Sequence, residues 1–183
     1  LAYGITTLPH LRELGIGGPY TVTGVSETES RKAIFSCRPT APSEEQACAD
    51  QIISRIATRA YRRPLESHEM ADLMAFYTDG HDEGGFEAGI GTAIQAVLAS
   101  PHFIFRIEEL AAPTGVEGIY KLADTDLTTR LSFFLWGTPP DDELLQVAAE
   151  GRLSDLEVLD AQVDRMLDDP RAEGLGERFA AQW

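Results

Sequence analysis

The stretch SEEQACADQIISRIATRA, residues 43–60, decides the fold class of this chain. Its opening letters, SEEQ, have the capping-box pattern, and their acidic side chains suit the positive end of a helix dipole. The apolar residues that follow recur at the spacing of one helix face: Ile52, Ile53, Ile56, Ala57 and Ala60. The stretch therefore predicts an amphipathic helix that begins at Ser43, buries one side and ends before Pro64.

Further helical patterns fill most of the remaining sequence. In the first block, a second helix follows Ser67, and a third ends before Pro101. A turn between these two helices is expected at Gly80, Gly84 and Gly85. Residues 111–118 have the composition of a linker or surface loop. In the second block, helix starts are expected from the capping patterns at Asp124-Thr125 and Ser154, and from the prolines of Pro139-Pro140-Asp141-Asp142-Glu143.

We therefore predict a mainly α fold, built from two consecutive helical modules, residues 37–110 and 119–183, that pack as a bundle. The short apolar run at residues 103–107 is expected to cross the core. The aromatic residues expected to supply the core are Tyr61, Phe76, Phe86, Phe103, Phe105, Phe133, Phe134 and Trp136.

Residues 1–36 differ from the rest, because glycine, proline, threonine and serine punctuate short β-branched or aromatic runs. They predict either an extended, β-like segment, such as the end of an upstream β domain, or an irregular arm. At the other end, a helical pattern runs to Trp183 without a stop signal. We therefore expect the chain to be part of a longer polypeptide.

The composition narrows the classes of function. The chain has 183 residues, 43% of them hydrophobic, and its 15 basic and 30 acidic residues give a formal net charge of −15. This charge repels phosphate overall, so we do not expect a nucleic-acid-binding protein. No apolar run approaches the roughly 18 residues of a membrane-spanning helix, and we expect none.

The two cysteines, Cys37 and Cys48, fit neither a CxxC redox motif nor a CxxCH haem-attachment motif. Two thiols cannot complete a tetrahedral zinc site, and none of His10, His68, His81 and His102 stands at a zinc-finger spacing. From spacing alone, a disulfide and two buried free thiols are equally good interpretations. No cofactor is expected in this segment.

Residues 79–87, DGHDEGGFE, look at first like a calcium loop. However, His81 stands at the third position of that loop and Ile90 at the position of the bidentate glutamate. A polar turn between helices explains the segment better, and we predict no metal site.

Four arginines, Arg55, Arg59, Arg62 and Arg63, share one helix face by their spacing. They could bind an anionic partner. The favoured interpretation is that they pair with acidic residues of the same chain, as arginine does at partly buried contacts.

A second group of polar residues surrounds the apolar run at 103–107. Asp126 and Arg130 stand at i, i+4, and the spacing predicts an ion pair between them, with Arg130 partly buried. Arg106 and Glu108 are expected to be members of structural ion pairs, and His102 to be the one buried histidine. These five residues, His102, Arg106, Glu108, Asp126 and Arg130, are the candidate ligand or ion-pair site.

Several strings resemble known domains. SRKAIFSCRP (30–39), AYRRP (60–64), GFEAGI (85–90) and SPHFIFRIE (100–108) are similar to one domain. LSFFLW (131–136), PDDELL (140–145), QVDRML (162–167) and FAAQW (179–183) are similar to the domain that follows it. Both resemble the planctomycete-type, or PSD-series, domains of unknown function, which occur in large exported proteins of planctomycetes, myxobacteria and related bacteria.

The resemblance carries over no catalytic residue, because the activity of these domains is not established. It implies export to the periplasm or cell surface, and it implies a disulfide, because the family pattern has cysteines at the positions of Cys37 and Cys48. Proteins with these domains often carry c-type cytochrome-like domains, so a haem c would lie elsewhere in the polypeptide.

Three hypotheses for function follow. The first is a non-catalytic helical scaffold or assembly segment of a larger exported protein, whose partners are other domains or protein subunits. The second is part of an oxidoreductase or electron-transfer protein whose haem lies in other domains. The third is an enzyme or ligand-binding module with a site between the two helical modules.

Overall fold

The computed structural model describes residues 15, 17, 20, 21, 24–106, 108, 110–113 and 120–180. Within these residues the fold is mainly α, with nine α-helices and one two-stranded sheet. Leu1–Ala33 and Ile34–Trp183 form two compact units. The expected upstream β domain falls largely on residues outside the described ranges. Within the predicted arm, the structure has a helix, α1 (Glu29–Ile34), in place of extended or irregular chain.

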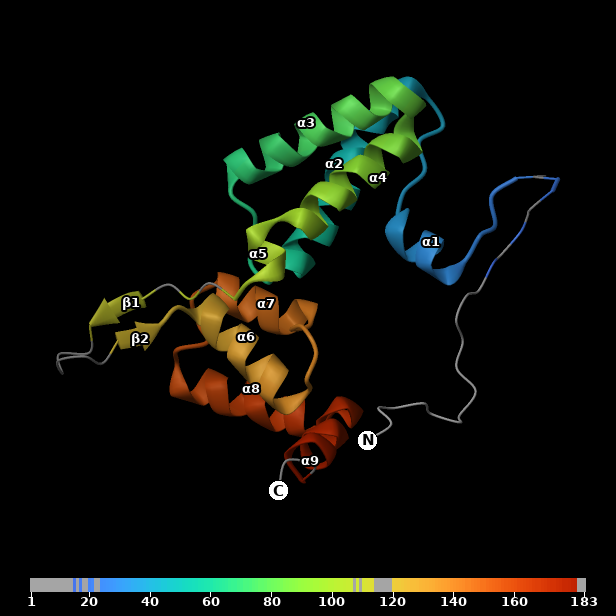
Figure 1. Ribbon diagram of the computed structural model, residues 1–183. Coiled ribbons are helices and arrows are strands. Elements are labelled where there is room, and N and C mark those ends of the chain that lie inside the picture. The colour runs from blue at the N-terminus through green and yellow to red at the C-terminus, as the bar shows by residue number, and fades with distance from the viewer. Residues whose placement is uncertain are drawn as a thin grey trace, which may run out of the picture. The chain divides into compact units, whose positions relative to one another are not determined.

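Three long helices form the first module: α2 (Pro42–Tyr61), α3 (Ser67–Gly84) and α4 (Phe86–Ala99). They lie side by side, with α3 packed most extensively on α4 and α2 packed against both (Figure 1). The predicted stripe on α2 is confirmed, since Ile52, Ile53 and Ala57 are buried in the core between them. A short helix, α5 (Pro101–Ile104), follows α4.

The second module holds α6 (Asp124–Leu135), α7 (Asp142–Ala149), α8 (Leu156–Asp168) and α9 (Glu173–Ala180), with a 3-10 turn at Pro170–Ala172 before α9. Helix α6 packs against the other three helices (Figure 1). A second core lies between them, and its buried members are Leu135, Trp136, Leu144, Ala148, Leu153 and Met166. No helix in the described ranges is both long and apolar enough to cross a membrane.

A β-hairpin replaces part of the expected loop between the modules. Strand β1 (Leu110–Pro113) pairs antiparallel with β2 (Tyr120–Leu122). The prediction of a linker at 111–118 is therefore wrong for residues 111–113, which belong to β1. The rest of that linker, residues 114–118, lies outside the described ranges.

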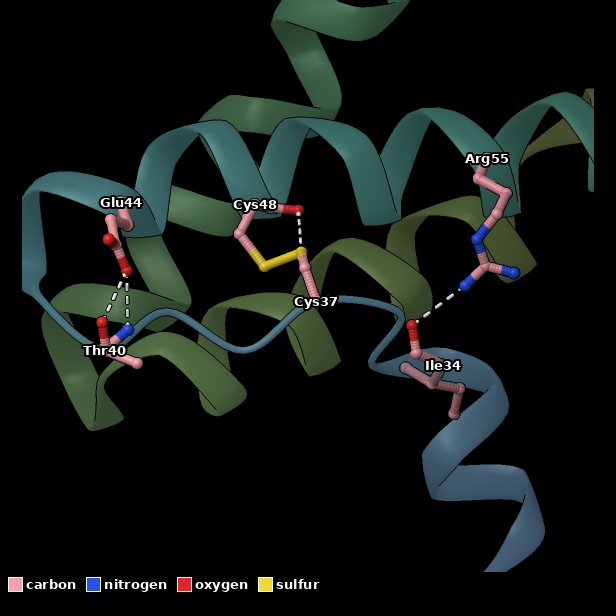
Figure 2. The surroundings of a disulfide bond; sticks show 6 residues. All are labelled: Ile34, Cys37, Thr40, Glu44, Cys48 and Arg55. Carbon is pink, nitrogen blue, oxygen red and sulfur yellow. Dashed lines mark hydrogen bonds between the residues drawn. A yellow bond between two sulfur atoms is a disulfide. The ribbon is translucent and has the colours of Figure 1, made fainter.

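Two helix boundaries differ from the prediction. Helix α2 begins at Pro42, because proline has a helical φ and lacks the N–H that a first turn leaves unpaired. No capping box forms at Ser43; the Glu44 carboxylate accepts hydrogen bonds from the N–H (2.8 Å) and hydroxyl (3.0 Å) of Thr40 instead (Figure 2). Helix α3 continues through the predicted turn, because Gly80 lies within it, and the helix ends only before Gly85, whose φ is +79°.

Asp124 and Ser154, which were predicted to cap helices of the second module, instead form hydrogen bonds with each other. Ala123 precedes α6, and the Asp124 carboxylate accepts hydrogen bonds from the Leu153 N–H (2.8 Å) and from the N–H and hydroxyl of Ser154. Asp155 rather than Ser154 caps α8. Asp124 and Ser154 therefore tie the start of α6 to the loop before α8.

The prediction of the aromatic core is half right. Tyr61 and Trp136 are buried, and Phe86 and Phe133 are partly buried. Four others are exposed to between 41% and 61%: Phe76, Phe103, Phe105 and Phe134. Residues 103–106 of the apolar run do not cross the core, because Pro101 starts a new helix of only four residues in which Phe103 and Ile104 remain exposed. Residue 107 lies outside the described ranges.

Candidate functional site

A small cavity of about 70 Å³ lies where the two modules meet. Three segments line it: the end of α2, the chain from α5 toward β1, and the first turns of α6. The lining residues are Tyr61, Arg62, Arg63, His102, Phe105, Arg106, Glu108, Thr125, Asp126, Thr129 and Arg130. All five members of the candidate site predicted from sequence therefore lie around one cavity, which also holds two arginines from the predicted helix face.

Arg62 connects two segments at this cavity. It follows α2 directly and has a left-handed backbone conformation, with φ of 61°. Its guanidinium donates hydrogen bonds to the carbonyl oxygens of Ala60 (2.9 Å), His102 (2.9 Å) and Phe105 (3.2 Å). Burial, together with the positive charge of Arg106, lowers the pKa of Arg62. Arg62 is therefore a fixed cation beside a second cation.

Arg106 lies against an aromatic ring. The carbon of its guanidinium is 3.9 Å from the centroid of Phe133, a residue of α6. This cation–π contact holds the planar group in one orientation. We expected Arg106 to form a structural ion pair. In the described ranges it has this ring contact, and its charge helps to lower the pKa of Glu108.

Arg130 pairs with Glu108 through two hydrogen bonds, of 2.7 and 2.6 Å. These bonds lower the pKa of Glu108 and raise that of Arg130. The sequence predicted Asp126 as the partner of Arg130, but the bidentate partner is Glu108, and Asp126 acts on the pKa of Arg130 only through its charge. The long arginine side chain reaches across to the other module, and it is exposed rather than partly buried.

Glu69, a residue that the sequence did not single out, lies beside the same cavity. Its buried carboxylate accepts two hydrogen bonds from Arg63, of 2.8 and 2.7 Å, and a third from the Glu66 N–H. Glu66 and Glu69 form a capping box at the start of α3, and the spacing of these two glutamates was the available sequence signal.

His102 completes this group. Its Nε2 lies 3.4 Å from Glu69 Oε1, and its Nδ1 lies 3.4 Å from the Arg63 guanidinium. The prediction of a buried histidine is wrong, because the His102 side chain is 44% exposed. It follows Pro101 on α5, which lies outside the core for the reason given above.

We expect the free energy of unfolding to fall at acid pH because the Glu69 carboxylate becomes protonated. The hydrogen bonds from Arg63 are the main cause that lowers the pKa of Glu69 from 4.5 to about 2. Since the unfolded chain binds this proton more readily, the stabilisation is fully present above about pH 4.5 and is lost as the pH falls to about 2. We expect about 2 kcal/mol at neutral pH, below the full value of the shift because solvent screens part of the interaction.

Urea unfolding between pH 2.5 and 7 tests this expectation. Glu69→Gln should be less stable than the original protein at pH 7, and the difference should shrink steadily toward acid pH. Asp72→Asn, on the exposed side of the same helix, is the matched control and should change stability at pH 7 by less than about 0.5 kcal/mol. A Glu69→Gln difference that is equal at pH 7 and pH 3 would contradict the role given to this carboxylate.

All four arginines of the predicted helix face donate hydrogen bonds within the chain. Arg55 donates to the Ile34 carbonyl oxygen (3.0 Å; Figure 2), and Arg59 donates to both oxygens of Asp142, at 2.9 and 2.5 Å. The acceptors of Arg62 and Arg63 are those described above. Arg59 thereby connects α2 to the start of α7. Binding of an anionic partner to this face stays a prediction.

Cys37 and Cys48 form a disulfide that fastens the chain before α2 to the buried side of that helix (Figure 2). Among the residues that the structure describes, no group of three or more histidine, cysteine, aspartate or glutamate residues could hold a metal ion.

Comparison with protein families divides the chain at the hairpin. Residues 48–108 match PSD5, a protein family of unknown function (DUF1595), and residues 122–183 match PSD4, also of unknown function (DUF1592). Two consecutive stretches of the chain therefore match PSD-series families. The PSD5 match ends at Glu108 and the PSD4 match begins at Leu122, so the cavity lies at the junction of the two domains.

Searches of curated proteins and of solved structures found no match to the chain. The resemblance to PSD-series domains is thus confirmed. Because both families are of unknown function, it assigns no reaction to this chain.

Proposed function

We propose that the PSD5–PSD4 pair is a non-catalytic helical assembly segment of a larger exported protein. The observation that supports this proposal is an apolar groove of about 650 Å³ along α3, α4 and α5. The apolar groove has Leu73, Phe76, Ala96, Ala99 and Pro101 among its lining residues. Near it, Leu98, Phe103, Ile104 and Phe105 are between 41% and 60% exposed.

The charge around the apolar groove indicates its partner. Polar residues line it beside the apolar ones, including the acidic residues Glu69 and Asp72, and the whole chain has a net charge of −15. An amphipathic helix placed in such a groove buries its apolar face and leaves its flanks at the rim. We therefore propose that the occupant is an apolar helix with basic flanks, from another domain of the same polypeptide or from a protein subunit.

Hydrogen exchange tests this proposal. The amides of residues 96–106 should exchange more slowly in the intact polypeptide, isolated from its source, than in the 183-residue chain alone. Phe76→Ser in the intact polypeptide should restore fast exchange, because it removes the largest apolar contact in the groove. Leu156→Ser is the matched control, since Leu156 is 74% exposed on α8 and does not line the groove. Equal exchange in the isolated chain and the intact polypeptide would contradict the proposal.

The disulfide supports export, because such bonds persist in oxidising compartments and are rare in the cytosol. We propose an extracytoplasmic location, in the periplasm or at the cell surface. Mass spectrometry of the intact source protein under non-reducing conditions tests both the proposed export and the proposed place of this chain in a larger polypeptide. It reports the length of the polypeptide, the Cys37–Cys48 bond and any covalent haem c in another domain.

Loss of the disulfide should destabilise the first module. Cys37→Ala/Cys48→Ala opens a loop with a sequence separation of 11 residues, and the chain-entropy relation gives a loss of about 2–3 kcal/mol. Urea unfolding with and without dithiothreitol measures this loss. The reductant should lower the midpoint of the original protein and leave that of the double variant unchanged. A midpoint of the original protein that does not respond to complete reduction would refute the expectation.

A further inference from the structure

The cavity between the domains has an excess of positive charge that the proposed assembly function does not use. Four guanidinium groups line it, against the carboxylates of Glu108 and Asp126. Glu69 pairs with Arg63, and Glu108 pairs with Arg130. Two further cations, Arg62 and Arg106, line the cavity beside these pairs, and the charge of Arg106 also acts on Glu108. The described part of the chain records no ion pair between a carboxylate and either of these two guanidiniums.

Both guanidiniums are held in place before any ligand arrives. Arg62 is held by its three carbonyl acceptors, and the exposed Arg106 is oriented by its contact with the ring of Phe133. The two positive charges repel each other, and this repulsion contributes to the lowered pKa of Arg62. A bound anion would relieve the repulsion, and little side-chain entropy would be lost because the groups are already ordered.

We propose that the cavity between PSD5 and PSD4 binds a small oxyanion, the carboxylate or phosphate group of a ligand, through Arg62 and Arg106. The guanidinium of Arg106 can offer paired N–H donors to either oxyanion. Arg62, whose Nη2 already donates to two carbonyl oxygens, contributes its positive charge and its remaining N–H donors. Thr125, in the first turn of α6, also lines the cavity. A volume of about 70 Å³ corresponds to about two water molecules, so it admits the anionic head of a ligand and leaves the remainder outside.

The net negative charge of the whole chain disfavours anion binding outside this site. A chain with a net charge of −15 repels anions at long range. Saturable anion binding to this protein therefore requires a local group of fixed cations. Because residues from both PSD domains line the cavity, a bound anion would also stabilise the junction between them.

Calorimetric titration of the 183-residue chain with inorganic phosphate, and separately with acetate, tests the proposal at constant ionic strength set by chloride. We expect saturable binding of at least one anion with a dissociation constant of about 1 mM. Stronger binding of phosphate indicates a phosphorylated ligand, and stronger binding of acetate indicates a carboxylic acid. Two-dimensional NMR should show shifts of the Arg62 and Arg106 side-chain signals, with no shift at Arg152.

Substitutions separate the site from a general charge effect. Arg106→Gln should weaken binding about tenfold or more, the loss expected for a charge-assisted hydrogen bond. Arg106→Lys keeps the charge but loses the planar group, and it should weaken binding about threefold. Arg152→Gln removes the same charge from an exposed residue that does not line the cavity, so it should leave affinity unchanged.

Circular dichroism and thermal unfolding establish that each variant is folded before titration. Absence of saturable binding of both anions up to about 50 mM, far above the expected dissociation constant, would overturn the proposal. So would equal weakening by Arg106→Gln and Arg152→Gln. Neither result touches the assembly proposal, which depends on the apolar groove and not on this cavity.

Discussion

Replacement of Trp136 by alanine is expected to lower the free energy of unfolding by about 4 kcal/mol. The Trp136 side chain is 1% exposed, and it is the largest fully buried side chain in the described ranges. Its indole N–H donates to the Met166 carbonyl oxygen at 2.8 Å. Truncation would leave a large cavity among α6, α7 and α8 and would leave that carbonyl without its donor.

Trp136 also holds a charged network in place. The guanidinium of Arg171 lies over its ring, with the carbon 3.5 Å from the centroid, and that of Arg165 lies 5.7 Å away. Both arginines form ion pairs with Asp141, which caps α7 by accepting a hydrogen bond from the Leu144 N–H. Loss of the ring should therefore loosen the start of α7 as well as the core.

Equilibrium unfolding in urea, followed by circular dichroism, measures this effect. Trp136→Phe keeps most of the buried surface and should lose about 1–2 kcal/mol, chiefly from the missing indole donor. Phe134→Ala is the matched control, because Phe134 lies on the same helix and is 61% exposed. It should change stability by less than about 1 kcal/mol. Equal losses in the free energy of unfolding for Trp136→Ala and Phe134→Ala would contradict the burial of Trp136 in the second core.

The contrast between these two aromatics shows why helix faces were predicted only in part. In this region the sequence favoured Phe133, Phe134 and Trp136 for the core, because they are large and apolar. The structure buries Thr128, Ser132 and Leu135 on α6 and Trp136 directly after it, and Leu127 and Leu131 pack against this core while partly buried. Small polar residues can face a core when close packing needs their size, and a hydrophobic pattern does not reveal this need.

The candidate site was predictable in its members but not in its pairs. His102, Arg106, Glu108, Asp126 and Arg130 were recognised as a polar group around an apolar run, and the structure brings them around one cavity. The pairing of Arg130 with Glu108, separated by 22 residues, required the fold itself. Spacing along a helix offers Asp126, whereas the preferred geometry of two parallel hydrogen bonds selects Glu108.

Helical periodicity was a better guide to the first module. On α2 the apolar spacing identified the buried side. Helix α4 has the small residues Gly89, Ala93 and Ala96, which permit a close approach of a neighbouring helix. That approach is realised against α3, where the backbone and side chain of Tyr77 lie directly over Gly89. Sequence could indicate that a close contact exists, but only the structure shows which glycine in α4 makes it.

Gly89→Ala should therefore destabilise the protein by about 3 kcal/mol, although alanine is the better helix former. A Cβ atom at this position would lie 2.7 Å from the Tyr77 carbonyl oxygen and 2.7 Å from its ring. Because part of this contact is backbone, α3 and α4 would have to separate. Gly91→Ala, two residues along the same helix, meets nothing within 4 Å and should stabilise the protein by about 0.5–1 kcal/mol.

The opposite signs of these two substitutions make a strict test, because helix propensity changes equally in both. Thermal unfolding followed by circular dichroism should move the midpoint down for Gly89→Ala and up for Gly91→Ala. If both substitutions raise the midpoint, the helices are not in contact at Gly89, and the α3–α4 packing that frames the apolar groove is incorrect. If both lower it, a factor other than the Tyr77 contact controls this helix. Only opposite shifts of the two unfolding midpoints support the close packing of α3 against α4 at Gly89.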